Sequence, residues 1–255
     1  MNRKWLCYTG FIFYIFCIAS CADIELLKKQ EEAGRLVGEA YMGQKDYTAA
    51  LNELLKAERT YTNDPHLHND LGLVYMTKDQ LTLAIEHFKK AIDLKPDYAP
   101  ARNNLGTAYL ATKNWDSAII CFKEVSRDLL YATPHYPLTN LGWAYYNKKE
   151  FALAESYYKE ALKIGPNFPI ALRGLGLTYI AIGNPLDAVN CFERAVKYSP
   201  GFPELFSDLA GAYAMLKEYN KALLFYRKVV SIAPGSQLAA EAINEISRIQ
   251  KEHLK

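Results

Sequence analysis

Few side chains in this 255-residue chain have a type and spacing that could do chemistry. His66 and His68 come closest to a metal-ligand pair, but residues two apart on a helix point to different sides. Gly174 and Gly176 form a Gly-x-Gly sequence, yet they lie inside a predicted helix and not in a phosphate-binding loop. The chain also has no nucleophile elbow and no zinc-type cysteine spacing. The sequence therefore predicts no enzyme activity, no metal and no cofactor.

Covalent chemistry is expected at one cysteine near the start of the chain. Arg3 and Lys4 precede an apolar run of 15 residues without a charge, which ends in the sequence Ile-Ala-Ser-Cys at Cys21. This composition predicts a secretory signal, and the run is shorter than the ~20 residues that span a bilayer. The alternatives are an ordinary signal peptide cut near Ala19 and a short uncleaved anchor.

The end of this segment resembles the bacterial lipoprotein processing box. The resemblance implies that residues 1–20 are removed, that Cys21 is acylated and anchors the protein, and that residues 21–30 form a short tether. Ala22, which follows the cysteine where aspartate is absent, resembles the address of an outer-membrane lipoprotein. A lipid anchor facing the periplasm is therefore expected.

The elements that carry the rest of the chain repeat six times. The repeats have small anchor residues separated by 34, 34, 36, 34 and 34 positions: Gly38, Gly72, Gly106, Gly142, Gly176 and Ala210. Tyrosine lies three residues after each anchor and alanine twelve residues after it. This is the tetratricopeptide pattern, which predicts an all-α, right-handed superhelical solenoid of helix pairs over residues 31–235.

The second repeat shows why these residue types recur. Its two helices are expected at residues 66–78 and 81–94, each with apolar side chains at a period of 3.6. Gly72 and Ala84 are small, so the helices can approach closely, while Tyr75 and Phe88 fill the space beside them. A two-residue-longer step after Gly106 predicts a looser connection over residues 128–136. Residues 236–255 are expected to form a C-terminal capping helix.

In such solenoids the first helix of each repeat lines the concave face. Positions one and four after the anchors form an apolar stripe: Leu73, Met76, Leu110, Trp143, Tyr146, Leu177 and Ile180. An exposed stripe of this kind predicts a groove that a helix or extended segment of a partner protein covers. The alternative is that the chain covers its own groove, with residues 22–30 or with the terminal helix.

A polar row runs beside the stripe, at the positions two and three before the anchors. Its members include Asn69, Asn103, Asn104, Thr139, Asn140, Arg173, Ser207 and Asp208. Asparagine amides both donate and accept hydrogen bonds, so the row could hold the backbone of a bound segment. We assign Asn103, Asn104, Asn140 and Arg173 to the groove with the stripe. Capture of a carboxylate tail is disfavoured because only Arg173 supplies a cation there.

Charge and cysteine content narrow the partners further. The chain has 30 basic and 28 acidic side chains, so nothing favours nucleic acid as a partner, and no small-molecule substrate is expected. Cys121 and Cys191 lie two repeats apart, about 20 Å by solenoid geometry, which exceeds the reach of a disulfide. Both are predicted to be buried thiols.

The order of these parts resembles the pilotins of type IV pilus systems: a lipoprotein signal, six tetratricopeptides with a longer connection after the third, and a short cap. The Asn-Asn-Leu-Gly sequence ending at Gly106 is also similar to that family. The resemblance implies an outer-membrane lipoprotein that binds the secretin subunit and aids its localisation and ring assembly. Two alternatives remain open: an adaptor for periplasmic peptidoglycan enzymes, and a component of outer-membrane protein assembly.

Overall fold

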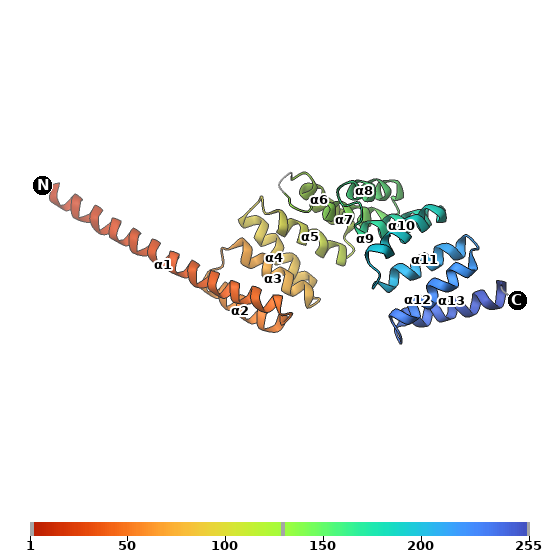
Figure 1. Cartoon of the computed structure of the whole chain (residues 1–255). Coiled ribbons are helices and arrows are strands. Elements are labelled where there is room, and N and C mark those ends of the chain that lie inside the picture. Colours follow the sequence, from red (N-terminus) through yellow and green to blue (C-terminus); the bar gives the residue numbers. More distant parts are fainter. Residues whose placement is uncertain (1–2, 129–130, 254–255) are drawn as a thin grey trace. The chain divides into compact units, whose positions relative to one another are not determined.

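The protein is built from helices alone in the part that the structure describes. The computed structural model describes the backbone of residues 3–128 and 131–253, and the side chains of these ranges from residue 23 onward. Every regular element there is an α-helix (Figure 1). The predicted fold class, an all-α array of helix pairs, is therefore confirmed. The side chain of Cys21 lies outside the described residues, so its lipidation stays a prediction.

The helices divide into two compact units, which we call the N-terminal and the C-terminal unit. The N-terminal unit ends at Thr112. It holds α1 (Arg3–Gly43), α2 (Tyr47–Thr60), α3 (Pro65–Thr77), α4 (Leu81–Leu94) and α5 (Ala99–Ala111). Helix α1 pairs with α2 and α3 pairs with α4, while α3 also contacts both α1 and α5. The first helices of successive repeats thus lie side by side in this unit.

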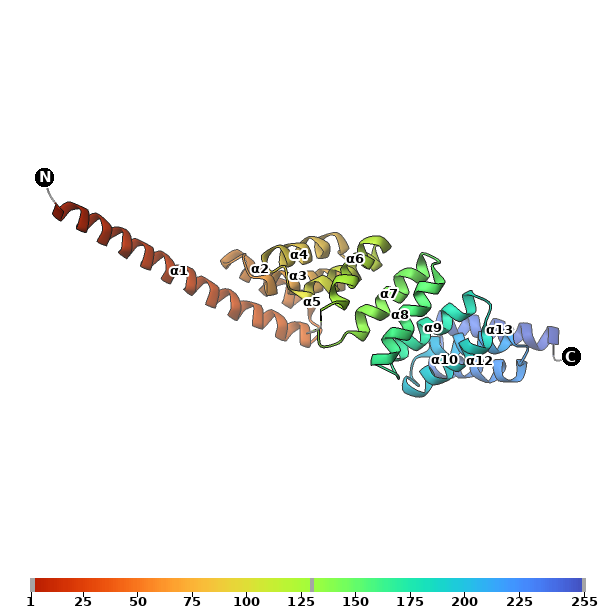
Figure 2. The same cartoon turned by 90° about the horizontal axis from the view of Figure 1, so that it is seen from above.

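The C-terminal unit starts at Lys113. It holds α6 (Trp115–Ser126), α7 (His135–Asn147), α8 (Phe151–Ile164), α9 (Pro169–Ala181), α10 (Pro185–Tyr198), α11 (Pro203–Met215), α12 (Tyr219–Ile232) and α13 (Gln237–His253). Helix α9 lies beside α10 and α12 beside α13 in both views (Figures 1 and 2). The connection after the third repeat ends at Pro134, because α7 begins at His135, so it ends two residues earlier than predicted.

Local sequence sets where these helices begin and turn. The side chains of Asp46, Asp64 and Asn114 accept hydrogen bonds from the backbone at the starts of α2, α3 and α6. Between the two helices of a pair, one residue adopts a left-handed conformation, as Lys45 does with a φ of 63°. Hydrogen bonds from the backbone N–H groups of Lys45 and Asp46 to the end of α1 close that turn.

The anchor glycines make room for an aromatic ring from the second helix of their own repeat. A Cβ added to Gly72 would lie 2.5 Å from the Phe88 ring, and one added to Gly176 would lie 2.5 Å from Phe192. Both rings are fully buried. The predicted close approach of the helices at Gly72 therefore has a direct cause, since only a residue without a side chain admits the ring.

The N-terminal end differs from the expected tether. Residues 21–30 are part of α1, which runs without a break from Arg3 to Gly43. The stretch holds no glycine or proline and is rich in leucine, lysine and glutamate, so no residue in it ends a helix. Within the described residues, no helix combines the length and the hydropathy needed to cross a bilayer.

The C-terminal end forms helix α13, which packs against α12 and α11. Ala239, Ala242 and Ile249 are buried against the array, while most of the other side chains of α13 are exposed. This amphipathic helix covers the last repeat pair with a polar outer face. Cys121 and Cys191 are both buried thiols, as predicted, and burial raises the pKa of Cys191 to about 11.

Candidate functional site

Three first helices of the C-terminal unit form one face. Helix α9 contacts both α7 and α11, so the positions one and four after each anchor lie on neighbouring helices. Four residues of the predicted stripe belong here: Trp143, Tyr146, Leu177 and Ile180. Trp143 is exposed and the other three are half-buried, as expected of side chains that line an open surface.

Trp143 and Tyr146 form an aromatic platform on α7. Their rings stack with centroids 5.5 Å apart and an angle of 11° between their planes. Phe151 supports Tyr146 from the start of α8, at 5.7 Å between ring centroids. The Trp143 side chain keeps 39% of its surface exposed although it is held in place. A large, ordered, exposed indole loses little conformational entropy when a partner covers it.

A hollow of about 250 Å³ lies next to the platform, and we call it the platform hollow. Its apolar lining includes Trp143, Ile170 and Leu177. Asn140 and Arg173 bring polar groups to the same hollow. The structure therefore brings together four residues that the sequence analysis assigned to the groove: Asn140 and Trp143 from α7, and Arg173 and Leu177 from α9. A side chain of leucine or phenylalanine size fits such a space.

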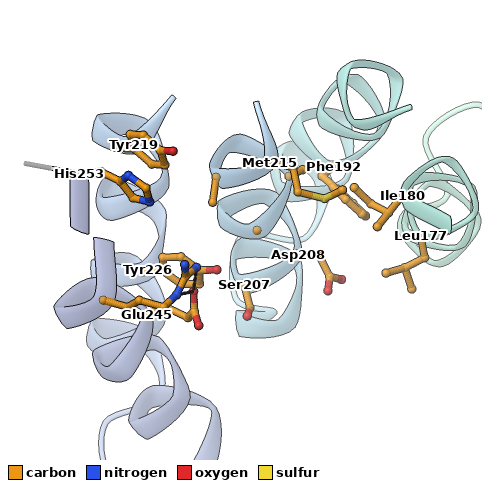
Figure 3. Close-up of a pocket in the computed structure, with 14 residues that line it drawn as sticks. Leu177, Ile180, Phe192, Ser207, Asp208, Met215, Tyr219, Tyr226, Glu245 and His253 are labelled. Atoms are coloured by element: carbon orange, nitrogen blue, oxygen red, sulfur yellow. Dashed lines mark hydrogen bonds and ion pairs between the residues drawn. The ribbon is translucent and has the colours of Figure 1, made fainter. Parts of the chain in front are cut away.

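A larger cavity of about 540 Å³ follows on the other side of Leu177, and we call it the C-terminal cavity. Figure 3 shows Leu177 and Ile180 on one side, Tyr226 and Glu245 on the other, and Asp208 between them. Its remaining lining includes Met215, Tyr219, Arg248 and His253. Because Leu177 lines both spaces, the platform hollow and the C-terminal cavity adjoin in one surface of the C-terminal unit.

Arg173 uses its charge inside the chain. Its Nε donates to Oδ2 of Asp208 at 2.6 Å, and its guanidinium lies over the Phe202 ring at 5.7 Å. Burial raises the pKa of Asp208, and the hydrogen bond and charge of Arg173 lower it. Arg173 was assigned to the groove as a polar contact for a partner. It lines the hollow, but it also joins the fifth repeat to the sixth.

The polar row makes the same kind of bond in the N-terminal unit. Asn104 Nδ2 donates to Asn69 Oδ1 at 2.9 Å, and Arg35 Nη1 lies 3.5 Å from Asp70 Oδ2. Each pair joins the residue three before one anchor to the residue two before the next, 35 positions later. These pairs therefore link successive repeats. The side chains that form them already have hydrogen-bond or ion-pair partners within the chain.

The remaining assigned residues lie on α3 and α5, two first helices of the N-terminal unit. Leu73, Met76, Leu110 and Asn103 are half-buried. The Oδ1 atom of Asn103 is buried without a hydrogen-bond donor among the described residues. Asn69 in this unit and Thr139 in the other are buried, which corrects the expectation that the whole polar row faces the groove. Thr139 Oγ1 donates to the His135 carbonyl instead, because its partner position is Gly174, which has no side chain.

Sequence reasoning missed the residues that the terminal helix contributes. Glu245, Arg248 and His253 line the C-terminal cavity from α13. His253 stacks on Tyr219 at 4.2 Å between ring centroids, and Arg248 donates to Glu245 at 2.6 Å. The amphipathic spacing of residues 237–251 predicts a capping helix, with a cover over the groove as the alternative, but it does not identify the side chains that reach a cavity. The terminal helix forms one wall of the cavity and leaves the space open.

His66 and His68 lie on the same helix but contact different partners. His66 Nδ1 lies 3.0 Å from the Tyr98 hydroxyl, whereas His68 Nδ1 lies 3.0 Å from Nδ1 of His87. The two side chains diverge, as their spacing predicted. His87 and Glu58, which come from other helices, complete a group around His68 that could hold a metal ion.

Comparison with known proteins agrees with the repeat architecture. Models described as TPR repeat or tetratricopeptide repeat match residues 74–113, 136–168 and 173–237. This is a tetratricopeptide repeat protein. The subunit 6 of the anaphase-promoting complex of Arabidopsis thaliana is 23% identical over 65% of this chain and 31% of its own length. The chain spans less than half the length of this and the next curated relatives.

Two solved structures match the tetratricopeptide chain over almost their whole length. PilW, a widely conserved type IV pilus biogenesis factor, has a TM-score of 0.78 at 22% identity, covering 84% of this chain and 98% of PilW. The PilF structure of Pseudomonas aeruginosa has a TM-score of 0.73 at 20% identity, covering 86% and 99%. In sequence, the type IV pilus assembly protein PilF of that organism is 28% identical over 56% of this chain and 57% of its own. At these identities the structures share the fold.

Proposed function

We propose that this tetratricopeptide repeat protein is a lipid-anchored outer-membrane pilotin that binds the secretin subunit of a type IV pilus system. The observation that carries the binding role is the exposed aromatic platform at Trp143 beside two adjoining spaces. The choice of system is supported by the similarity to PilW and PilF over nearly the full length of both structures. The apolar run ending at Cys21 supports the anchor.

The geometry suits a short amphipathic segment of the partner. Two apolar side chains, one in the platform hollow and one in the C-terminal cavity, would flank Leu177. An apolar side chain that leaves water for such a space contributes about 1.5–3 kcal/mol. The Arg248–Glu245 pair at the cavity provides polar contacts for the partner's backbone or charged residues. Binding by a few anchors of this kind is typical of helix-in-groove recognition.

The division of work follows from the two ends of the chain. The acyl chains on Cys21 would supply the membrane address, since more than one chain gives stable anchoring. The C-terminal unit would bind the secretin subunit and keep it at the outer membrane until its ring assembles. No chemical step is needed for this role, and the described repeats act as a binding scaffold.

The test of partner binding is co-purification of the secretin subunit with the full-length protein from gently solubilised membranes. We expect Trp143→Asp to abolish co-purification and to leave the helical content and melting temperature nearly unchanged. Leu224→Asp is the matched control, because Leu224 on α12 is 61% exposed and lines neither space. Equal recovery of the secretin with Trp143→Asp and Leu224→Asp would remove the groove from the binding role.

The identity of the co-purified proteins tests whether the partner belongs to a type IV pilus system. A secretin subunit among the co-purified proteins is the expected result. Recovery of peptidoglycan synthases or hydrolases without a secretin would overturn the pilus assignment and leave the protein as a periplasmic adaptor. For the anchor, Cys21→Ala should yield a larger, unprocessed and unlipidated species, and normal processing of that variant would refute the lipoprotein signal.

A further inference from the structure

Three helices of the N-terminal unit bring metal-ligating side chains together. Glu58 lies on α2, His68 on α3 and His87 on α4, and one potential ligand atom of each lies within 4.8 Å of the others. The Nδ1 atoms of His68 and His87 are 3.0 Å apart, and His68 Nδ1 lies 3.8 Å from Glu58 Oε1. This group shares no residue with the groove that we assign to the partner, so its role does not depend on the proposed function.

The surroundings of His68 fix which nitrogen is available. Its Nε2 lies 2.8 Å from the carbonyl oxygen of Thr62. A carbonyl only accepts, so Nε2 carries the hydrogen and donates it. In the neutral ring the lone pair is then on Nδ1, which points at His87 and Glu58. A histidine that donates one N–H to a carbonyl and presents the other nitrogen is the usual arrangement of a metal ligand.

The ring of Tyr75 holds the ring of His87 in position. The Tyr75 ring stacks on it with centroids 5.2 Å apart and an angle of 23° between the planes. Because the Nδ1 atom of His68 has no hydrogen, the 3.0 Å contact requires a proton on Nδ1 of His87 or a cation between the two nitrogens. A metal ion would take the place of that proton, and the single hydrogen of the neutral His87 ring would then be carried on Nε2.

The distances suit one ion in particular. Zinc bound at about 2.0–2.1 Å with tetrahedral angles separates two ligand atoms by about 3.3–3.4 Å. Two of the separations, 3.0 and 3.8 Å, lie on either side of this range, and all three ligand atoms lie within 4.8 Å of one another, so shifts of up to about 1.5 Å close the set. Two imidazole nitrogens and one carboxylate oxygen are a ligand set that zinc takes with water as its fourth ligand.

We propose that Glu58, His68 and His87 bind one zinc ion, which ties helices α2, α3 and α4 together and stabilises the N-terminal unit. The ion would join the end of the first repeat to both helices of the second. A metal that binds the folded state and not the unfolded chain shifts the unfolding equilibrium toward the folded state.

The electrostatics favour neutral ligands. Burial is the main cause that lowers the pKa of both His68 and His87, which favours the uncharged ring over its protonated form. The Glu58 carboxylate offsets part of the zinc charge. Lys90 opposes it, and its ammonium group is held by a hydrogen bond of 2.8 Å to the Thr62 hydroxyl. Removing the Lys90 charge should therefore strengthen zinc binding.

The test is zinc titration of the full-length protein, purified in detergent without a histidine tag and stripped with a chelator. We expect one zinc ion per chain by calorimetry, a higher melting temperature with zinc, and the visible absorption of tetrahedral Co²⁺ when cobalt replaces zinc. His87→Gln should weaken binding at least about 100-fold, and Glu58→Gln about 10-fold. His66→Gln is the control, because His66 contacts Tyr98 and lies outside the group.

The outcomes separate cleanly. Uptake of one ion that both ligand variants weaken and His66→Gln preserves supports the site. No uptake, or uptake that neither Glu58→Gln nor His87→Gln changes, overturns it. Circular dichroism checks that each variant folds. If His87→Gln does not fold, Glu58→Gln decides, because the Glu58 side chain is 26% exposed and its amide replacement keeps the shape.

Discussion

The two units use one repeat for different surfaces. In the N-terminal unit the first helices meet through polar pairs such as Asn104 with Asn69, and through the ion pairs of Arg35. The C-terminal unit has one pair in the same register, Arg173 with Asp208, and the positions one and four after its anchors carry the aromatic platform at Trp143 and the two adjoining spaces around Leu177. The helix pairs are alike, so the difference lies in a few side chains on the first helices.

Two sets of positions on the first helices therefore differ in role. One set joins successive repeats, and the other faces the proposed groove. Side chains three before an anchor bond to side chains two before the next anchor, and these bonds are satisfied within the chain. The apolar side chains one and four after an anchor, such as Trp143 and Leu177, remain at least partly open to the surface. The first set joins successive repeats, and we propose that the second set binds the partner.

The largest effect should come from the charge cluster in the N-terminal unit. Arg35 Nε lies 3.3 Å from Asp64 Oδ2, and Arg35 Nη1 lies 3.5 Å from Asp70 Oδ2. The Arg35 side chain is only 14% exposed. Arg35→Met leaves these carboxylates without a cation, and we expect a loss of about 3 kcal/mol in unfolding free energy. Arg173→Met breaks the more exposed pair with Asp208 and should cost about 1 kcal/mol.

Urea unfolding at neutral pH measures both losses. Arg59→Met is the control, because Arg59 on α2 is exposed and we expect it to change little. Equal losses for Arg35→Met and Arg173→Met would show that the two units rely on this bond to the same extent.

The next effect concerns binding at one repeat position in both units. Leu73 and Leu177 each lie one residue after an anchor, and both are half-buried. Leu177→Ser removes the side chain shared by the platform hollow and the C-terminal cavity, so we expect secretin affinity to fall about 30-fold, or about 2 kcal/mol. Leu73→Ser should change it less than about 3-fold. Surface plasmon resonance with the purified secretin subunit measures both, and the opposite ranking would move the site to the N-terminal unit.

The fold could be predicted from the sequence because each repeat carries the residues that set its own helix–helix contacts. The spacing of 34 residues and the pairing of Gly72 with Phe88 depend on contacts within one repeat, so a single copy already contains them. The Arg35–Asp70 and Arg173–Asp208 pairs are 35 residues apart in the sequence, but their contact depends on how one repeat stacks on the next, which a single repeat does not contain.

The candidate site was predictable only in part. Trp143, Tyr146, Leu177 and Ile180 share a face, as their register predicted. The depth of the C-terminal cavity depends on how α13 packs against α11 and α12, and no local pattern gives that packing. The histidine group was missed for the same reason, since Glu58, His68 and His87 come together only when three helices pack.

A smaller effect should appear in the pH dependence of the N-terminal unit. Burial, with the nearby Asp64 charge, raises the pKa of Glu31 to about 7, against the lowering effect of Arg35. The folded state thus binds this proton more tightly than the unfolded chain. Its contribution to stability is fully present below the ordinary pKa of 4.5 and is lost as pH rises through about 7.

Glu31→Gln removes this dependence. At pH 8 the variant should melt about 2–4 °C higher than the parent protein, and near pH 4.5 the two should melt together. Glu32→Gln is the control, because Glu32 is exposed whereas Glu31 is 2% exposed. A Glu31→Gln variant that is less stable than the parent at pH 8 would show that the carboxylate is stabilising when charged.

The smallest effect should be the same in both units. It tests whether the units differ only in the faces of their first helices. Lys45 and Lys217 occupy the same turn between paired helices, with φ of 63° and 61°, and both are exposed. Glycine adopts this conformation without the strain of a side chain, although it adds freedom to the unfolded chain. Lys45→Gly and Lys217→Gly should each stabilise the protein by about 0.5 kcal/mol, and the same turn already has glycine at Gly183. Chemical unfolding of the two variants and of Gly183→Lys, which should lose a similar amount, measures this. A gain in one unit alone would mean that the turns differ too, and that the units differ in more than the faces of their first helices.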